Sequence, residues 1–167
     1  MTDAEFQAAF EQHKDAVYRF AWRMSGSSAA AEDITQDVFT ALLRYPNRFD
    51  PDRGTLRAFL LSIARNLVLK RWRAEHRFEP LDEEGVAAEV FDVERGDVGE
   101  MVGRAVSALR PLQREVVILA EYEGLTLAEI ARAVDADVGT VKSRLHRARE
   151  NLRRMLAPLR SRQPTTT

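Results

Sequence analysis

The stretch that most constrains the fold runs from Thr126 to Arg154 and has the pattern of two helices joined by a tight turn. Thr126 is placed to cap the first helix, and Glu129 three residues later completes a capping box. Asp137 is a suitable cap for a second helix that starts at Val138. The apolar residues that follow are spaced as on one side of a helix: Val141, Leu145, Ala148, Leu152 and Leu159.

The other side of this second helix is strongly basic. Residues 138–162 contain eight Lys or Arg and one acid, Glu150, which gives a net charge of +7. Ordinary solvated helices usually mix both signs, because i,i+4 ion pairs then stabilise them. We therefore predict a helix-turn-helix, in which the second helix enters the major groove of DNA and the first braces it. The alternative interpretation is an amphipathic helix with a solvated basic face.

Composition excludes several kinds of site. The chain has 167 residues, enough for one medium domain or two small ones, and it contains no cysteine. Disulfides, thiolate metal sites and cysteine nucleophiles are therefore excluded. The histidines, His13, His76 and His146, lie far apart without ligand spacing, so we expect no metal and no cofactor. No apolar run of membrane-spanning length and no signal-peptide pattern is visible, so we expect a cytoplasmic protein without membrane insertion.

The net charge of −1 hides a strong segregation of charge along the chain. Residues 1–77 have twelve basic and ten acidic side chains, residues 78–100 have one and nine, and residues 101–167 have twelve and seven. Segregation rather than the total decides which partners each part can meet. Two basic segments separated by an acidic one are therefore compatible with DNA binding.

The first 77 residues have the periodicity of a three-helix bundle. Helices are expected over 4–24, 29–44 and about 55–77, with Thr55 capping the third. The predicted buried stripe of the third helix consists of Leu56, Phe59, Leu60, Ile63 and Leu67. Its predicted exposed stripe consists of Asn66, Lys70, Arg73 and Arg77. Trp72 lies among these cations, an arrangement that suits unstacked, single-stranded bases, and it stays open whether Trp72 completes the core instead.

Periodicity is lost between residues 78 and 100, where acids dominate and glycines are frequent, so we predict an acidic flexible linker. Helices are expected again over 101–109 and 111–122.

The predicted fold class is all-α, with two small helical domains. These are a first module at residues 1–77 and a second module at residues 101–162, followed by a tail at residues 163–167. No catalytic set and no phosphate-binding glycine loop is visible, so we do not expect an enzyme.

Taken together, these motifs resemble those of an extracytoplasmic function (ECF) sigma factor of the sigma-70 family, a bacterial promoter-recognition subunit of RNA polymerase. The resemblance covers nearly the whole chain and rests on three motifs in the family's order. Residues 31–44 (AEDITQDVFTALLR) resemble the polymerase-clamp-binding helix, and residues 55–73 (TLRAFLLSIARNLVLKRWR) resemble the −10 melting helix. Residues 137–156 (DVGTVKSRLHRARENLRRML) resemble the −35 recognition helix. The two modules would then be sigma regions 2 and 4.

The resemblance implies roles for individual side chains of the first module. The clamp helices of the largest polymerase subunit would contact Asp33, Gln36, Asp37 and Phe39. A base flipped out of the −10 element would be held by Phe49, the loop through Gly54, and Asn66. The DNA backbone at the upstream fork would be held by Arg65, Lys70, Arg71 and Arg73. Phe59 stands where many relatives carry Trp, which implies a packing change.

The resemblance also implies a reading surface on the second module. The base edges of the −35 element would be contacted by Lys142, Ser143, His146 and Arg147. Phosphates, which position the protein without specifying sequence, would be contacted by Thr140, Arg144 and Arg149. Relatives often carry Arg where this chain has Lys142, which lacks the planar fork of Arg, so a relative's promoter sequence does not transfer.

Further partners follow from the family. The linker is implied to thread through the polymerase towards the RNA exit path, and a purely solubilising tether is the alternative. An anti-sigma factor, often membrane-linked, is implied to cover the polymerase-binding and DNA-binding faces.

Two other functions stay open on the sequence alone. A stand-alone helix-turn-helix regulator that acts as a dimer would explain residues 101–162, but not the basic end of the third helix or the acidic linker. No long dimerisation heptad is present outside the recognition helix either. An adaptor protein whose basic faces bind acidic partners is the second alternative.

Overall fold

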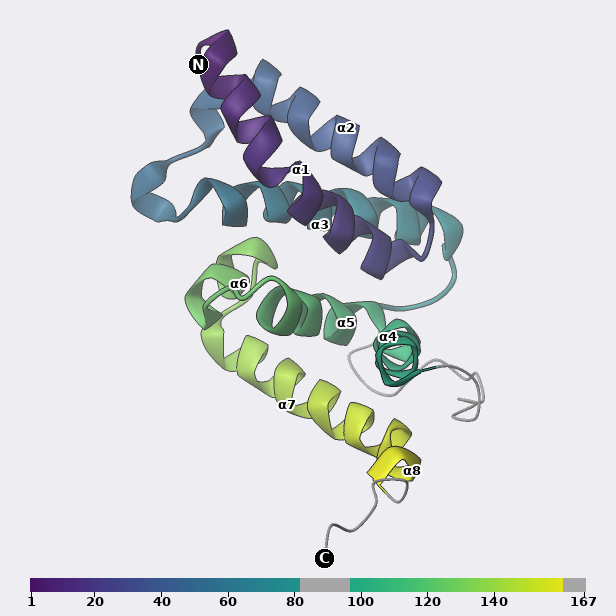
Figure 1. The fold of residues 1–167 in the computed structure, drawn as a ribbon. Coiled ribbons are helices and arrows are strands. Elements are labelled where there is room, and N and C mark those ends of the chain that lie inside the picture. Colours follow the sequence, from purple (N-terminus) through teal and green to yellow (C-terminus); the bar gives the residue numbers. More distant parts are fainter. Residues whose placement is uncertain (82–96, 161–167) are drawn as a thin grey trace, which may run out of the picture.

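A computed structural model describes residues 1–81 and 97–160 of the chain. The first module contains α1 (Asp3–Ser25), α2 (Ser28–Arg44), two 3₁₀ turns (Pro46–Arg48 and Pro51–Arg53) and α3 (Leu56–Glu75). The second contains α4 (Val98–Ala108), α5 (Pro111–Val117), a π-helical segment (Ile118–Tyr122), α6 (Leu127–Ala133), α7 (Val138–Met155) and α8 (Ala157–Arg160). The all-α prediction is confirmed for the described residues (Figure 1). Most of the predicted flexible linker and the tail at 163–167 lie outside them.

Local signals in the sequence set the starts of the helices. The Thr126 hydroxyl accepts a hydrogen bond from the Glu129 N–H at 3.2 Å, and the Glu129 carboxylate accepts one from the Thr126 N–H at 3.0 Å. The Asp137 carboxylate accepts from the Thr140 N–H at 2.7 Å, which begins α7. The Thr55 hydroxyl caps α3 in the same way. The predicted caps of α3, α6 and α7 are therefore confirmed, and with them the helix-turn-helix.

Most helix boundaries lie within one or two residues of the prediction, and two differ by more. Helix α4 begins at Val98, because the Asp97 carboxylate caps it by accepting from the Glu100 N–H at 2.8 Å. The last three residues of the predicted linker are therefore helical. Helix α7 ends at Met155 and the short α8 follows a turn, so Leu159 does not continue the apolar side of α7.

The two modules share one hydrophobic core. Helices α1, α2 and α3 pack together, and α3 also contacts α6 of the second module. The fully buried side chains come from both modules and include Phe20, Ile34, Leu61, Ile118 and Ile130. They belong to a single cluster of buried apolar residues. The two modules are therefore docked against each other (Figure 1). Burial of apolar surface from both modules in this common cluster stabilises the docked arrangement.

Helix α3 is buried on a different side from the one predicted. Its least exposed residues are Ala58, Leu60, Leu61, Ala64, Val68 and Leu69. Of the five residues predicted to be buried, only Leu60 is, and the other four (Leu56, Phe59, Ile63 and Leu67) are half-buried. The prediction was wrong because it considered the first module alone, whereas α3 packs against α1 and α2 and also against α6.

A π turn follows α5. The Glu123 N–H donates to the Ile118 carbonyl at 3.0 Å, and the Leu125 N–H donates to the Leu119 carbonyl at 2.9 Å. These bonds reach further back along the chain than the four residues of an α-helix, so the turn accommodates an extra residue. Gly124 then adopts φ of 66°, in the left-handed region that glycine favours, and ends the segment.

Candidate nucleic-acid interface

Helix α7 presents the four predicted base-reading side chains together. Lys142, Ser143, His146 and Arg147 are all exposed. They are held outward because the residues on the opposite side of the helix, Val141, Leu145 and Ala148, are buried. Helix α7 packs against α5 and α6, as expected of a recognition helix braced by the rest of its module. The imidazole of His146 lies 3.3 Å from the Glu150 carboxylate, one turn further along.

The three predicted phosphate contacts are in different surroundings. Thr140 is half-buried at the start of α7, and its N–H lowers the pKa of the Asp137 carboxyl by donating a hydrogen bond to it. Arg149 is about half exposed and pairs with Glu121 at 2.6 Å. Such an exposed pair is weak and can exchange for a phosphate. Arg144 is half-buried, and its charge partly opposes the rise that burial causes in the pKa of the Glu115 carboxyl, so it lies towards the interior of the molecule.

Arg65 of α3 is not accessible as a DNA contact in this arrangement. Its side chain is 12% exposed, and its guanidinium donates to both oxygens of the fully buried Glu115 carboxylate, Nε at 2.7 Å and Nη2 at 3.0 Å. Burial raises the pKa of the Glu115 carboxyl, while the hydrogen bond and charge of Arg65 act in the opposite direction. A charge-assisted, two-pronged pair of this kind is among the stronger polar contacts in proteins.

The other predicted −10 DNA contacts of α3, Asn66 for the flipped base and three cations for the fork backbone, are on the surface. Asn66, Lys70, Arg71 and Arg73 are exposed. Arg71 pairs with Asp33 of α2 at 3.1 Å, which joins a predicted DNA contact to a predicted polymerase contact. Trp72 is half-buried and stacks on His76, with 4.5 Å between the ring centroids. Trp72 is therefore neither a core residue nor a free stacking platform.

The loop predicted to capture a flipped base faces the second module. Phe49 is half-buried against Phe59, with ring centroids 5.5 Å apart. The loop borders a hollow of about 550 Å³ whose far wall is formed by Glu129, Arg132 and Asp135 of the helix-turn-helix. The docked second module therefore stands directly beside this loop.

The predicted polymerase contacts on α2 separate into two kinds. Asp33, Gln36 and Asp37 are exposed on one face. Phe39 is 3% exposed and packs edge-on against Phe10, at a centroid distance of 5.0 Å, so in this arrangement it lies in the core and is not exposed beside the three polar residues. Only the family resemblance had placed Phe39 on that face, whereas helical spacing alone does not group it with the three polar residues.

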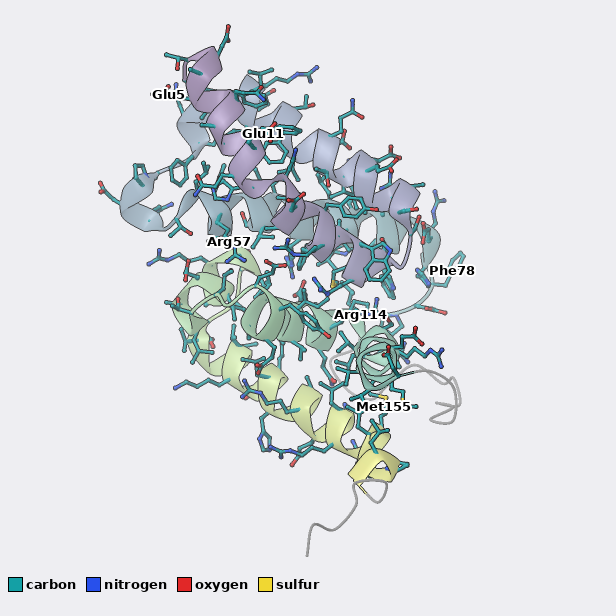
Figure 2. The ribbon with its side chains drawn as sticks, viewed as in Figure 1. Glu5, Glu11, Arg57, Phe78, Arg114 and Met155 are labelled. Atoms are coloured by element: carbon teal, nitrogen blue, oxygen red, sulfur yellow. The ribbon has the colours of Figure 1, made fainter. Side chains whose placement is uncertain are left out.

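Two buried acids were missed by the sequence analysis. Glu115 and Glu123 have fully buried side chains, and both are paired with arginines of the first module. Figure 2 shows Arg57, a partner of Glu123, between the two modules, together with Arg114, which donates to the Met24 carbonyl at 2.6 Å.

The sequence signal for Glu115 was an acid inside the apolar run of residues 111–120. A buried acid requires a cationic partner, and the sequence could not identify that partner.

Within residues 1–81 and 97–160, no cluster of His, Asp or Glu side chains is arranged to hold a metal ion. None of the helices in those ranges is long and apolar enough to cross a bilayer.

Comparison with known families accounts for both modules. Residues 9–78 match the model for sigma-70 region 2, and residues 99–152 match the model for sigma-70 region 4. The chain is 38% identical over 154 residues to the ECF RNA polymerase sigma factor SigE of Mycolicibacterium smegmatis, covering 87% of this chain and 59% of the relative. It is 32% identical over 159 residues to the ECF RNA polymerase sigma factor BldN of Streptomyces coelicolor, covering 90% of this chain and 60% of the relative. The chain thus spans about 60% of the length of these two relatives.

A solved structure matches the fold across both modules. It is the sigma factor RpoE in complex with the anti-sigma factor NepR from Bartonella quintana, with a TM-score of 0.72 and 27% sequence identity. The match covers 92% of this chain and 97% of the solved one. A second structure, CnrH in complex with the cytosolic domain of CnrY, has a TM-score of 0.69 and 25% identity and covers 97% of this chain and 92% of the other.

Proposed function

This chain belongs to the ECF sigma factors of the sigma-70 family, and from that premise we propose that it binds core RNA polymerase and directs promoter-specific initiation of transcription. The observation that carries the proposal is the common exposure of the four base-reading side chains of α7, on a chain whose other half matches region 2. The chain acts as a specificity subunit, and we expect no catalytic activity of its own.

Each module has a separate task. Region 2, at residues 1–77, binds the polymerase clamp through Asp33, Gln36 and Asp37 and engages single-stranded −10 DNA with the loop at Phe49 and with Asn66. Region 4, at residues 101–162, reads the duplex −35 element through α7. Capture of an unstacked base costs a few kcal/mol, which the loop and the polymerase together must offset.

Engagement of the −10 element requires the modules to separate. In the docked arrangement Arg65 is occupied by Glu115, and the base-capturing loop faces the helix-turn-helix. Core polymerase supplies the energy for separation by binding the separated form more tightly than the docked form. The linker then spans the two engaged modules.

A protein inhibitor is part of this proposal. One solved structure similar to this chain over both modules is a sigma factor in complex with an anti-sigma factor, and a second is the complex of CnrH with the cytosolic domain of CnrY. We propose that an anti-sigma factor binds this chain and stabilises the docked arrangement. Such a partner needs only to bind the docked form more tightly than the separated form.

The test is run-off transcription with purified, sigma-free core polymerase on a pool of genomic promoter fragments. We expect discrete transcripts that depend on the chain and that become weaker and less promoter-specific with Arg147→Ala, whereas the matched α7 variant Arg153→Ala retains them. A chain that forms no complex with core polymerase overturns the proposal. Dimeric, polymerase-independent binding to operator-like duplexes would identify the stand-alone regulator instead.

A further inference from the structure

Three arginines of the first module converge on one carboxylate of the second. Arg57 Nη2 lies 2.5 Å from Glu123 Oε2, Arg19 Nη2 lies 3.6 Å from the same oxygen, and Arg23 Nη1 lies 3.9 Å from Glu123 Oε1. The Arg57 guanidinium also donates to the backbone carbonyl of Glu123. The Glu123 side chain is fully buried, so these arginines enclose it. We call Arg19, Arg23 and Arg57 the arginine cluster.

Glu123 fills the arginine cluster incompletely. One carboxylate stands among three guanidinium groups, so the cluster keeps an excess of positive charge. Arg23 Nη1 and Glu123 Oε1 are both buried and have no hydrogen-bond partner. Buried polar atoms without partners are costly, and the unpaired Arg23 Nη1 marks a donor that a larger anion could reach while it also contacts Arg19 and Arg57.

The partners of the arginine cluster leave when the modules separate. Glu123 belongs to the second module, and so does Tyr122, whose ring lies 4.1 Å from the Arg23 guanidinium carbon. Separation therefore removes the only anion that pairs with the cluster among the described contacts. It leaves three clustered cations on the surface of the first module, a natural site for an external anion.

The arginine cluster also continues the predicted DNA-binding side of α3. Arg57 and Arg65 are eight residues apart on α3, about 12 Å along the helix axis. Both face the second module, and each is paired there with a fully buried glutamate. The second module thus places one carboxylate opposite each of two arginine positions along the same helix. This match favours a nucleic-acid backbone, with its repeated phosphates, over a single acidic side chain of a protein.

We propose that the arginine cluster is a binding site for a phosphate of promoter DNA, and that Glu123 is its internal occupant while the modules are docked. The inference rests on the proposed function, because it requires the modules to separate on the polymerase. A phosphodiester carries one negative charge shared by two non-bridging oxygens, and the planar fork of arginine suits such groups. Glu123 therefore competes with DNA for the same three side chains.

The test uses the complete chain bound to core polymerase and a fork-junction DNA with a single-stranded −10 segment. Binding is measured as a function of salt for the native chain, Arg19→Gln and Arg57→Gln. Arg44→Gln on α2, an exposed arginine outside the cluster, is the matched control. Arg19 is 48% exposed and makes the longer contact, so Arg19→Gln keeps the test informative if Arg57→Gln fails to fold.

We expect each cluster variant to bind the fork DNA about threefold to tenfold more weakly at low salt, with Arg44→Gln unchanged. The slope of log affinity against log salt should fall by about 0.7–0.9 for each phosphate that the variant no longer neutralises. Glu123→Gln should have the opposite effect on the free chain and strengthen its binding to the same DNA, because the internal competitor loses its charge. Glu11 is an exposed acid on α1, and Glu11→Gln is the control for the Glu123→Gln measurement.

Unchanged affinity and slope in both cluster variants would overturn the inference and leave the cluster a purely structural contact. Loss of polymerase binding with an unchanged DNA slope would overturn it too, in favour of an acidic protein surface as the ligand. Failure of the native chain to bind polymerase at all would instead reject the proposed function, so the two failures are distinguishable.

Discussion

The two proposed DNA-binding surfaces differ in accessibility, although both are basic helices of the same chain. On α7, Lys142 and Arg147 are exposed. On α3, Arg65 is 12% exposed and held by Glu115 of the other module. We therefore expect region 4 to read a duplex while the modules are docked, and region 2 to engage DNA fully only after they separate.

The cause of this difference is the number of sides on which each helix is packed. Helix α7 buries one side against its own module and leaves the basic side to solvent. Helix α3 packs against its own bundle and also against α6. The second module thus covers part of the side of α3 that we propose to contact DNA. We therefore expect recognition of the −35 element to precede capture of the −10 element.

The largest effect is expected from preventing separation. Arg53→Cys and Arg132→Cys place thiols on opposite walls of one hollow, and a bis-maleimide then joins the modules. The native chain has no cysteine, so the reagent has no other thiol to modify. We expect −10 melting, followed by permanganate reactivity, to fall to background while −35 duplex binding persists. The unlinked double variant is the control, and full melting by the linked chain would refute the need for separation.

The second largest effect is expected from Glu115→Gln. Removing one partner of a buried ion pair costs about 3–5 kcal/mol, because the other charge stays buried without compensation. Docking should weaken accordingly, with faster amide hydrogen exchange along α3 and α5. Glu11→Gln should leave exchange at these helices unchanged. Equal protection in native chain and variant would show that Arg65 is not held by this carboxylate.

Arg147→Ala examines the accessible surface. We expect promoter binding to weaken by about 1–3 kcal/mol, with relaxed preference at one −35 position. Affinity measurements on single-base variants of the −35 element check this expectation. A uniform loss on all sequences would assign Arg147 to a phosphate instead.

A smaller effect is expected from Asn66→Ala on the less accessible surface. Its exposed amide is predicted to contact a flipped base, and removal of such a hydrogen bond costs about 1 kcal/mol. Open-complex formation should be impaired more than −35 duplex binding, as monitored by permanganate footprinting. Normal melting by this variant would remove the assignment of Asn66.

The smallest effect concerns pH. Burial lowers the pKa of His13, and the nearby charge of Arg57 lowers it further. A histidine with a lowered folded pKa contributes stability that is complete above the unfolded value, about 6.5, and is lost as pH falls through the folded value. The melting temperature of the native chain should therefore fall more steeply between pH 7.5 and pH 5.5 than that of His13→Gln, by a few degrees. The difference in melting temperature between the two proteins at pH 8 serves as the baseline. If their melting temperatures fell in parallel with pH, this role of His13 would be contradicted.

Local features of the fold were predictable from the sequence, because their causes are local. The capping box at Thr126 and Glu129 involves residues three apart, and the cap at Asp137 is equally local. The exposure of Lys142 and Arg147 likewise follows from helical spacing in one segment. Which of these side chains contact bases stays a prediction.

The features that the sequence did not predict depend on residues far apart in the chain. Arg65 and Glu115 are separated by fifty positions, so neither local pattern indicates that they meet. The burial of Phe39 was not predicted, because it depends on Phe6 and Phe10 of another helix. The buried side of α3 was missed for the same reason, since docking of the second module decides it.

The π turn after α5 has a consequence for how this family can vary. Glu115 and Glu123 are eight positions apart, and the extra residue in the turn makes them equivalent to about seven, close to two full α-helical turns. The two acids therefore project towards the same neighbour. A homologue one residue shorter in this segment would present only one of them, so insertions and deletions here should distinguish sigma factors that close on themselves from those that stay open.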